Sequence, residues 1–289
     1  MKRTLYNLMG LMFLLASCHT IEDRDSEGPL ATKDQLKVTV VNTTTVNGKR
    51  GNQIAVNNST PLIAGQWNLL VKVSNKQQDT AVLPFKGLLK IPFIGTSAGG
   101  LVYDTLTVQV DTIDHAVDPT YKLLAGSGEK TWVWASGNKF QGGDVIYGRC
   151  GASDYTGTWQ TINTIQALSF SNWDGDGPES IDINGAMTFD LNGAANFTKT
   201  EFGVTTKGSF VFDFSTHKSA KAIGQITFGG TTILHGVSDG DHMKVVNTFD
   251  IISLTDDEMV LLYPTDRKPN SDWGEAAFWI FKRQGYIYP

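Results

Sequence analysis

The sequence has little cysteine, little histidine and no excess of positive charge, and each shortage excludes a class of function. Cys18 and Cys150 are the only cysteines among the 289 residues, so a disulfide framework is excluded. None of the five histidines falls in a metal-ligand spacing such as His-Glu-x-x-His. The net charge of -5 argues against nucleic acid as a partner, because nucleic-acid binding requires basic patches.

Long apolar runs are also scarce. The one that stands out, residues 8–15, follows a basic start and leads to Ser17 and Cys18. It is too short for a stable membrane span, and it has the form of a signal peptide covering residues 1–17. The motif at residues 14–18, Leu-Leu-Ala-Ser-Cys, resembles the lipobox of bacterial lipoproteins. That resemblance implies cleavage before Cys18 and a lipid on its sulfur; the alternative is a plain secretory signal with an incidental cysteine.

Residues 18–35 are predicted to form an acidic, solvated tether. The run at residues 22–27 contains four carboxylates and one arginine, and it buries no apolar area. It resembles the export signal that sends lipoproteins of Bacteroidetes to the outer face of the outer membrane, and an ordinary charged linker is the alternative. With Cys18 lipidated, Cys150 is left as a lone thiol, which we expect to be buried and inert.

The rest of the chain predicts an all-β protein, because short alternating or β-branched runs are separated by Asn, Gly, Asp and Pro. Residues 36–112 form the first expected domain, with strands at residues 38–41, 69–73 and 105–110. In the last of these, Leu106, Val108 and Val110 share one face. Tight turns are expected at Asn47-Gly48 and at Asn57-Asn58.

Residues 113–125 are expected to form a linker, and residues 126–289 a larger β-rich domain that holds six of the seven tryptophans. Trp132 and Trp134 are two residues apart on an expected strand, which favours one buried face for both. Residues 277–282 are apolar on both faces and predict a covered strand. Periodicity leaves the choice between a β-sandwich and a lipocalin-like barrel open.

Two resemblances suggest what the domains do. Residues 36–112 resemble a degenerate PKD or immunoglobulin-like module, through the segment 57–61, Trp67 and Pro84-Phe85, although Asn68 stands where PKD domains continue their Trp-x-Phe-Gly-Asp-Gly segment. Residues 128–134, Gly-Glu-Lys-Thr-Trp-Val-Trp, resemble the start of the β-rich domain in Bacteroidetes surface lipoproteins from loci of polysaccharide utilization. The resemblance implies a surface glycan-binding protein and carries no catalytic motif.

Sugar rings stack on aromatic side chains through their C–H faces, and their hydroxyls bind short polar side chains. The segment 171–179 combines one tryptophan with Asx residues and glycines, which is typical of a loop. A fold-back of its tryptophan onto the edge of the sheet is the alternative. A second loop tryptophan and three aromatic residues near residues 142–157 extend the candidate platform. The candidate glycan-binding residues are Trp173, Asn172, Asp174, Asp176, Tyr147, Tyr155, Trp159 and Trp273.

Two further chemistries were weighed. Asp174, Asp176 and Glu179 offer oxygen ligands for a structural Ca²⁺, although the EF-hand pattern is missing and an Asp/Gly turn needs no metal. Glu179 and Asp182 resemble part of the acidic strand of laminarinase-like glycosidases. They are three residues apart and therefore face opposite sides of a strand, whereas a catalytic pair must share a face.

We therefore expect a non-catalytic, two-domain surface lipoprotein that captures a neutral polysaccharide or oligosaccharide for an importer complex. The lipid on Cys18 would tie it to the outer membrane. Two alternatives remain: an adhesin or structural surface protein that uses its sheet edges, and a glycoside hydrolase with an unrecognised active site. The sequence predicts no cofactor beyond the possible Ca²⁺, and it specifies neither the sugar nor the oligomeric state.

Overall fold

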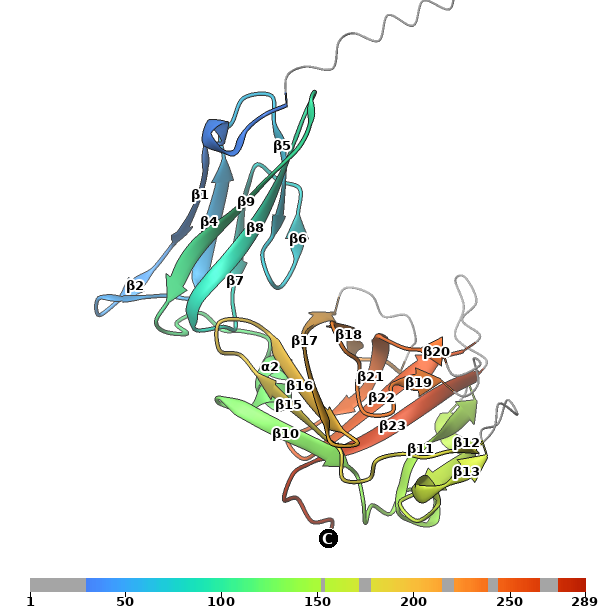
Figure 1. The fold of residues 1–289 in the computed structure, drawn as a ribbon. Coiled ribbons are helices and arrows are strands. Elements are labelled where there is room, and N and C mark those ends of the chain that lie inside the picture. The colour runs from blue at the N-terminus through green and yellow to red at the C-terminus, as the bar shows by residue number, and fades with distance from the viewer. Residues whose placement is uncertain (1–29, 152–153, 172–177, 215–220, 239–243, 266–274) are drawn as a thin grey trace, which may run out of the picture.

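The computed structural model describes residues 30–151, 154–171, 178–214, 221–238, 244–265 and 275–289 (Figure 1). Strands account for 56% of the described residues and helices for 7%, which confirms the all-β class. The chain forms a sandwich of two sheets, followed by a closed barrel of eight strands. Among the described residues, no helix combines the length and apolar character needed to cross a membrane.

The N-terminal sandwich begins after a short 3-10 helix, η1 (Lys33–Gln35). Its first sheet has the order β1-β4-β7 and its second the order β6-β5-β8-β9, all antiparallel. A small hairpin, β2-β3, projects from the first sheet (Figure 1). The bounds are β1 (Val38–Asn42), β2 (Thr45–Val46), β3 (Lys49–Arg50), β4 (Gln53–Asn58), β5 (Ala64–Asn68), β6 (Val73–Ser74), β7 (Gln78–Val82), β8 (Gly87–Ser97) and β9 (Gly100–Val110).

The core of the sandwich lies between these sheets. Ile54 and Val56 of β4 point inward from one side, and Trp67 packs on Phe93 from the other, with ring centroids 4.5 Å apart. The expected strand at 105–110 is part of β9, and the buried positions Val108 and Val110 lie on its inner face as predicted.

Two local predictions in this sandwich are wrong. Residues 69–72 do not form the expected strand, and Val73 begins β6 instead. The chain turns there: Leu69 N–H donates to the carbonyl of Lys72, and Leu70 has a φ of 67°. Asn57 and Asn58 end β4 rather than forming a turn. The Asn58 amide instead organises the turn that follows, since it accepts from Thr60 N–H and donates to the carbonyl of Ile63.

The C-terminal barrel consists of antiparallel strands in the order β10-β15-β16-β17-β18-β21-β22-β23. It is closed by pairing of β10 with β23, from Trp132 opposite Arg283 to Trp134 opposite Phe281. The structure thus has a barrel rather than a second sandwich. The bounds are β10 (Glu129–Trp134), β15 (Ala186–Asp190), β16 (Asn196–Glu201), β17 (Val204–Asp213), β18 (Gly224–Gly229), β21 (Thr248–Leu254), β22 (Glu258–Pro264) and β23 (Glu275–Arg283).

The part of β23 that does not pair with β10 pairs with another strand. This strand is β11 (Val145–Gly151), which pairs with β23 from Tyr147 opposite Trp279 to Gly151 opposite Glu275 and continues into β12 (Asp154–Asn163). Short elements complete the barrel: η2 (Phe140–Gly142), η3 (Gln166–Leu168), β13 (Phe170–Ser171), β14 (Pro178–Glu179), β19 (Val237–Ser238) and β20 (Lys244–Val245).

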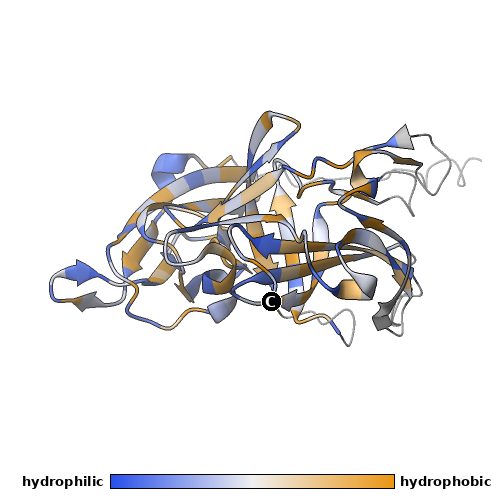
Figure 2. Cartoon of the chain, turned by 90° about the horizontal axis from the view of Figure 1, so that it is seen from below, coloured by the Kyte–Doolittle hydropathy of each residue, from blue (hydrophilic) through white to orange (hydrophobic). Residues whose placement is uncertain are grey.

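Aromatic side chains fill much of the barrel. Trp132 and Trp134 are both buried on its inner side, as their spacing predicts. β23 is apolar on both faces because Ala276, Phe278 and Ile280 belong to a second buried cluster on the outer side, which also contains Cys150. Figure 2 shows hydrophobic residues along strands of both parts of the molecule. The other inward aromatic residues are Phe189, Phe197, Phe210, Phe212, Phe228, Phe249, Trp279 and Phe281.

The expected linker at 113–125 contains a helix, α2 (Pro119–Ala125). The Asp118 carboxylate caps it by accepting from Thr120 N–H at 2.9 Å. The helix covers one end of the barrel, where Tyr121 lies 4.9 Å from the ring of Phe212 and Leu124 is fully buried. Seven residues are too few to show helical periodicity, which is why the sequence pattern indicated a linker.

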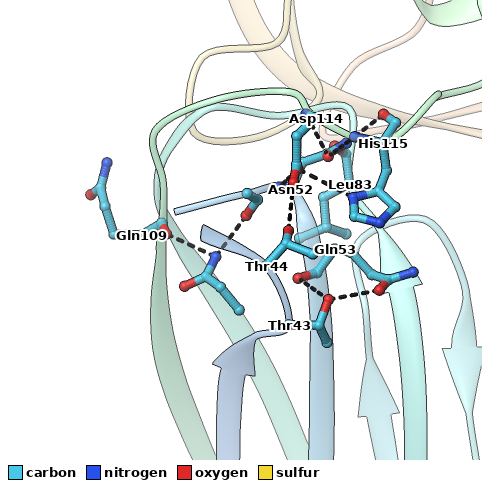
Figure 3. Close-up of polar contacts among 10 residues, drawn as sticks. Thr43, Thr44, Asn52, Gln53, Leu83, Gln109, Asp114 and His115 are labelled. Atoms are coloured by element: carbon cyan, nitrogen blue, oxygen red, sulfur yellow. Dashed lines mark hydrogen bonds and ion pairs between the residues drawn. The ribbon is translucent and has the colours of Figure 1, made fainter. Parts of the chain in front are cut away.

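One buried side chain ties the sandwich to the segment that leads into this helix. Asn52 donates to the carbonyls of Leu83 and His115 and accepts from the N–H groups of Asp114 and His115 (Figure 3). The amide of Asn52 therefore has a partner on every side, and the chain leaves the sandwich in a fixed direction.

Candidate functional site at the distal end of the barrel

The strands of the barrel define two ends. One end, next to the N-terminal sandwich, is covered by α2. We call the other the distal end; it is formed by the β16–β17 turn after Glu201, the end of β18 at Gly229, and the facing residues Pro264 and Glu275 of β22 and β23. Four pairs of described residues also lie at this end: Gly151 and Asp154, Ser171 and Pro178, Ser238 and Lys244, and Thr265 and Glu275.

Strand β16 places charge on the inner side of the barrel toward this end. Its residues 197, 199 and 201 share one face, so the buried Phe197 is followed by Lys199 and Glu201. Lys199 Nζ lies 2.8 Å from Glu201 Oε2 and donates to the carbonyl of Ile233 at 3.3 Å. Both side chains are largely buried, which makes this ion pair part of the interior.

His235 joins this pair to the segment that precedes β15. Its backbone N–H donates to Glu201 Oε1 at 2.6 Å, and its Nδ1 lies 3.5 Å from Glu179 Oε1. We call Lys199, Glu201, His235 and Glu179 the distal cluster. His235 is held in a left-handed conformation, with φ 47°, and only 5% of its side chain is exposed.

Aromatic rings pack around the distal cluster. The ring of Tyr147 meets that of His235 edge to face at 4.7 Å, and the indole N–H of Trp279 donates to the carbonyl of His235 at 2.8 Å. Further along β11, Arg149 pairs with Glu275, the first residue of β23, and donates to Gln160 Oε1 at 3.3 Å. The distal end therefore combines charged groups with aromatic rings.

Asp182 has a structural role at the same end. Its carboxylate accepts from the backbone N–H groups of Asn184 and Phe202, at 3.0 and 2.5 Å, and its carbonyl accepts from the Trp134 indole at 2.9 Å. Asp182 thus holds the segment before β15 against the β16–β17 turn.

The candidate glycan-binding residues divide into three groups. Tyr147 is fully buried, so its assignment to an exposed platform is wrong: β11 directs the ring into the barrel, against Trp279 and His235. Tyr155 and Trp159 lie on β12, and only the backbone of these two residues is described. The lipidation candidate Cys18 and the other site candidates, Asn172, Trp173, Asp174, Asp176 and Trp273, lie outside the described residues.

The described residues that flank segments 172–177 and 266–274 lie at the distal end. Ser171 pairs with Pro178, and Thr265 N–H donates to the carbonyl of Glu275 at 2.9 Å. Both pairs stand at the distal end. Glu179, the third Ca²⁺ candidate, contacts His235, and the described residues contain no group of three or more His, Cys, Asp or Glu that could hold a metal ion.

Sequence reasoning missed most of the distal cluster. Lys199, Glu201 and His235 belong to no motif that the sequence analysis singled out. The alternation of β16 carried the signal, because a face that begins with Phe197 and continues with two charged residues indicates a polar end to an apolar interior. A comparison with protein-family models finds no match for the chain, and a comparison with curated proteins finds none either, so the case for a function rests on this geometry.

Proposed function

We propose that the protein is a lipid-anchored surface protein that binds a neutral polysaccharide or oligosaccharide at the distal end of its barrel and holds it for import without catalysis. In this proposal Cys18 carries the lipid, and residues 18–35 form the tether. The sandwich, a PKD or immunoglobulin-like spacer, separates the barrel from the membrane. Its two facing sheets support that spacer assignment.

One observation carries the proposal. The segments that contain Trp173 and Trp273 are a hundred residues apart in the sequence, yet the described residues beside both stand at the distal end. A series of contacts connects the described residues beside the two segments. Glu179, beside the first, contacts His235, which packs against Tyr147 of β11. Two residues further along β11, Arg149 pairs with Glu275, beside the second segment. Two tryptophans with Asp and Asn neighbours in the sequence are suited to stacking on sugar rings and binding their hydroxyls.

The arrangement of the molecule supports the same use. The first described residues lie at the far end of the sandwich, and the barrel lies beyond its other end (Figure 1). A chain anchored through Cys18 would therefore present the distal end of the barrel away from the membrane. Display of many copies on one surface raises the effective affinity of a weak glycan site.

Replacing the two tryptophans tests this function. Trp173→Ala and Trp273→Ala should each weaken retardation in an affinity gel that contains the bound polysaccharide by roughly tenfold, as expected for a lost stacking contact of about 1.4 kcal/mol. Tyr103→Ala is the matched control, because Tyr103 is an exposed aromatic residue on β9 of the sandwich. Unchanged mobility of both tryptophan variants would contradict the proposed site.

The two rival functions give different results with the same protein. A glycan array combined with a reducing-sugar assay separates them from capture. A glycoside hydrolase would release reducing ends from the polymer it binds, and an adhesin would bind protein or its own copies while ignoring every glycan on the array.

A further inference from the structure

The turn between β16 and β17 has an unusual residue at its tip. Glu201 pairs with Val204, so the turn consists of two residues, Phe202 and Gly203. Both have positive φ values, 48° and 77°, as in a type I′ hairpin turn. A bulky aromatic residue with positive φ is a conformational outlier, and such outliers gather at functional sites.

The same protein shows what this turn normally requires. The β2–β3 hairpin is closed by Asn47 and Gly48, with φ values of 51° and 77°, between the paired residues Val46 and Lys49. Asn-Gly is the preferred pair for this conformation. Phe202 adopts the conformation of Asn47 without the side chain that favours it, so the demands of the turn do not explain the phenylalanine.

Core packing does not explain it either, because Phe202 is 62% exposed. Its backbone is nevertheless fixed: Phe202 N–H donates to Asp182 Oδ2 at 2.5 Å, and the Asp182 carbonyl accepts from the buried Trp134. The exposed ring is therefore carried by a backbone that the barrel core holds in place.

Polar groups adjoin Phe202. Glu201, immediately before it, belongs to the distal cluster. The Asp182 carboxylate that accepts from Phe202 N–H also accepts from Asn184 N–H, at 3.0 Å. Phe202 thus stands at the distal end beside exposed polar residues such as Asn184.

We infer that Phe202 is a glycan-contacting residue that provides a further stacking surface in the proposed site; this inference rests on the proposed function. A phenyl ring carries no hydrogen-bonding group, so it would recognise only a C–H face. The ligand it fits is a neutral glycan containing a pyranose ring whose C–H groups gather on one side, with its hydroxyls directed toward neighbouring polar groups such as the exposed Asn184.

The test separates stability from binding. Phe202→Asn supplies the residue that the turn prefers, so it should raise the Tm of the full chain while weakening binding of the polysaccharide about fivefold, the loss expected for one aromatic contact. Phe202→Tyr keeps the ring and should bind within about twofold of wild type. Tyr103→Asn, which removes an equally exposed ring from the sandwich, should leave binding unchanged.

Each outcome has one meaning. If the wild-type chain binds no glycan, the proposed function fails, and this inference fails with it. If wild type binds and Phe202→Asn binds equally well, only the role of Phe202 is overturned. A lower Tm for Phe202→Asn would also overturn it, because the ring would then serve the fold.

Discussion

Two aspartates of the sandwich and one in the segment that follows it have carboxylates that the folded state keeps ionised. The hydroxyl of Thr44 and the N–H of Asn52 lower the pKa of Asp114 to about 2 (Figure 3). The Arg50 side chain and backbone N–H do the same for Asp111, whose pKa is also about 2. For Asp79, hydrogen bonds from Ser74 and then Lys72 lower the pKa to about 2.

These aspartates predict an acid-labile sandwich. Their pKa values in the folded state lie below the ordinary value of 3.8, so the unfolded chain binds more protons as the pH falls. The stability they contribute is complete above about pH 4 and is lost between about pH 4 and pH 2. Urea unfolding followed by circular dichroism should show a falling midpoint across this window.

Asp111→Asn supplies the control for that experiment. Asparagine cannot ionise, so this variant should be less stable than wild type at pH 6, and the difference should shrink toward pH 2. A difference that stays constant from pH 6 to pH 2 would show that the Asp111 charge contributes nothing to folding.

At the scale of single elements, the seven-residue helix α2 is important because it covers one end of the barrel core. An isolated helix of this length is not stable in water, so α2 owes its existence to its cap and its contacts. Asp118 caps it, and the Trp132 indole donates to the Leu124 carbonyl at 2.8 Å. Tyr121, Leu124 and Ala125 are buried against the barrel, which makes α2 the cover of that end.

Removing a buried side chain of α2 should therefore destabilise the whole barrel. Leu124 is fully buried, and Leu124→Ala should cost about 2–5 kcal/mol of the free energy of unfolding. Lys122→Ala, on the exposed side of the same helix, should change it by less than about 0.5 kcal/mol. Equal effects of the two variants in urea unfolding would mean that α2 does not cover the core as described.

Elements with strong local signals were predictable from the sequence. The alternation at 105–110 indicated β9, and Asn47-Gly48 indicated a turn that the structure has. α2 was missed, although Asp118, Pro119 and Gly126 are the start and stop signals of a short helix. At residues 69–73 the apolar run indicated a strand, but Leu69 is buried as the anchor of a turn.

Closure of the barrel and assembly of the distal cluster depend on pairings between distant residues. The residue pattern of β10 and β23 is the same whether the two strands close a barrel or lie in opposite sheets of a sandwich. The choice between barrel and sandwich is therefore made by the pairing of the two strands, which their sequences do not reveal. The distal cluster combines Lys199 and Glu201 of β16 with Glu179 and His235 from two other parts of the chain. No spacing along the chain indicates that Glu179 and His235 meet this pair.

At the scale of the whole molecule, the sandwich and the barrel share one continuous core. Phe85 of the sandwich meets Tyr121 of α2 edge to face at 6.1 Å, and Tyr121 meets Phe212 of the barrel. Lys86 also accepts a backbone hydrogen bond from Gly193 at 2.7 Å. A cleft of ≈ 400 Å³ lies between the two parts, lined by Leu70 and Val73 of the sandwich and by Phe210 and Phe228 of the barrel.

Phe85 should therefore decide whether the two parts unfold together. In wild type the core passes without interruption through Phe85, which is fully buried, and we expect one cooperative transition. Phe85→Ala removes the side chain that joins the sandwich to α2, so the sandwich should unfold before the barrel.

In protein labelled with fluorotryptophan, the ¹⁹F signal of Trp67 reports on the sandwich, and those of Trp132 and Trp279 report on the barrel. The signals should lose their native positions at one temperature in wild type and in Leu88→Ala, an exposed control, and at two temperatures in Phe85→Ala. Coincident transitions in all three proteins would show that the junction does not depend on Phe85.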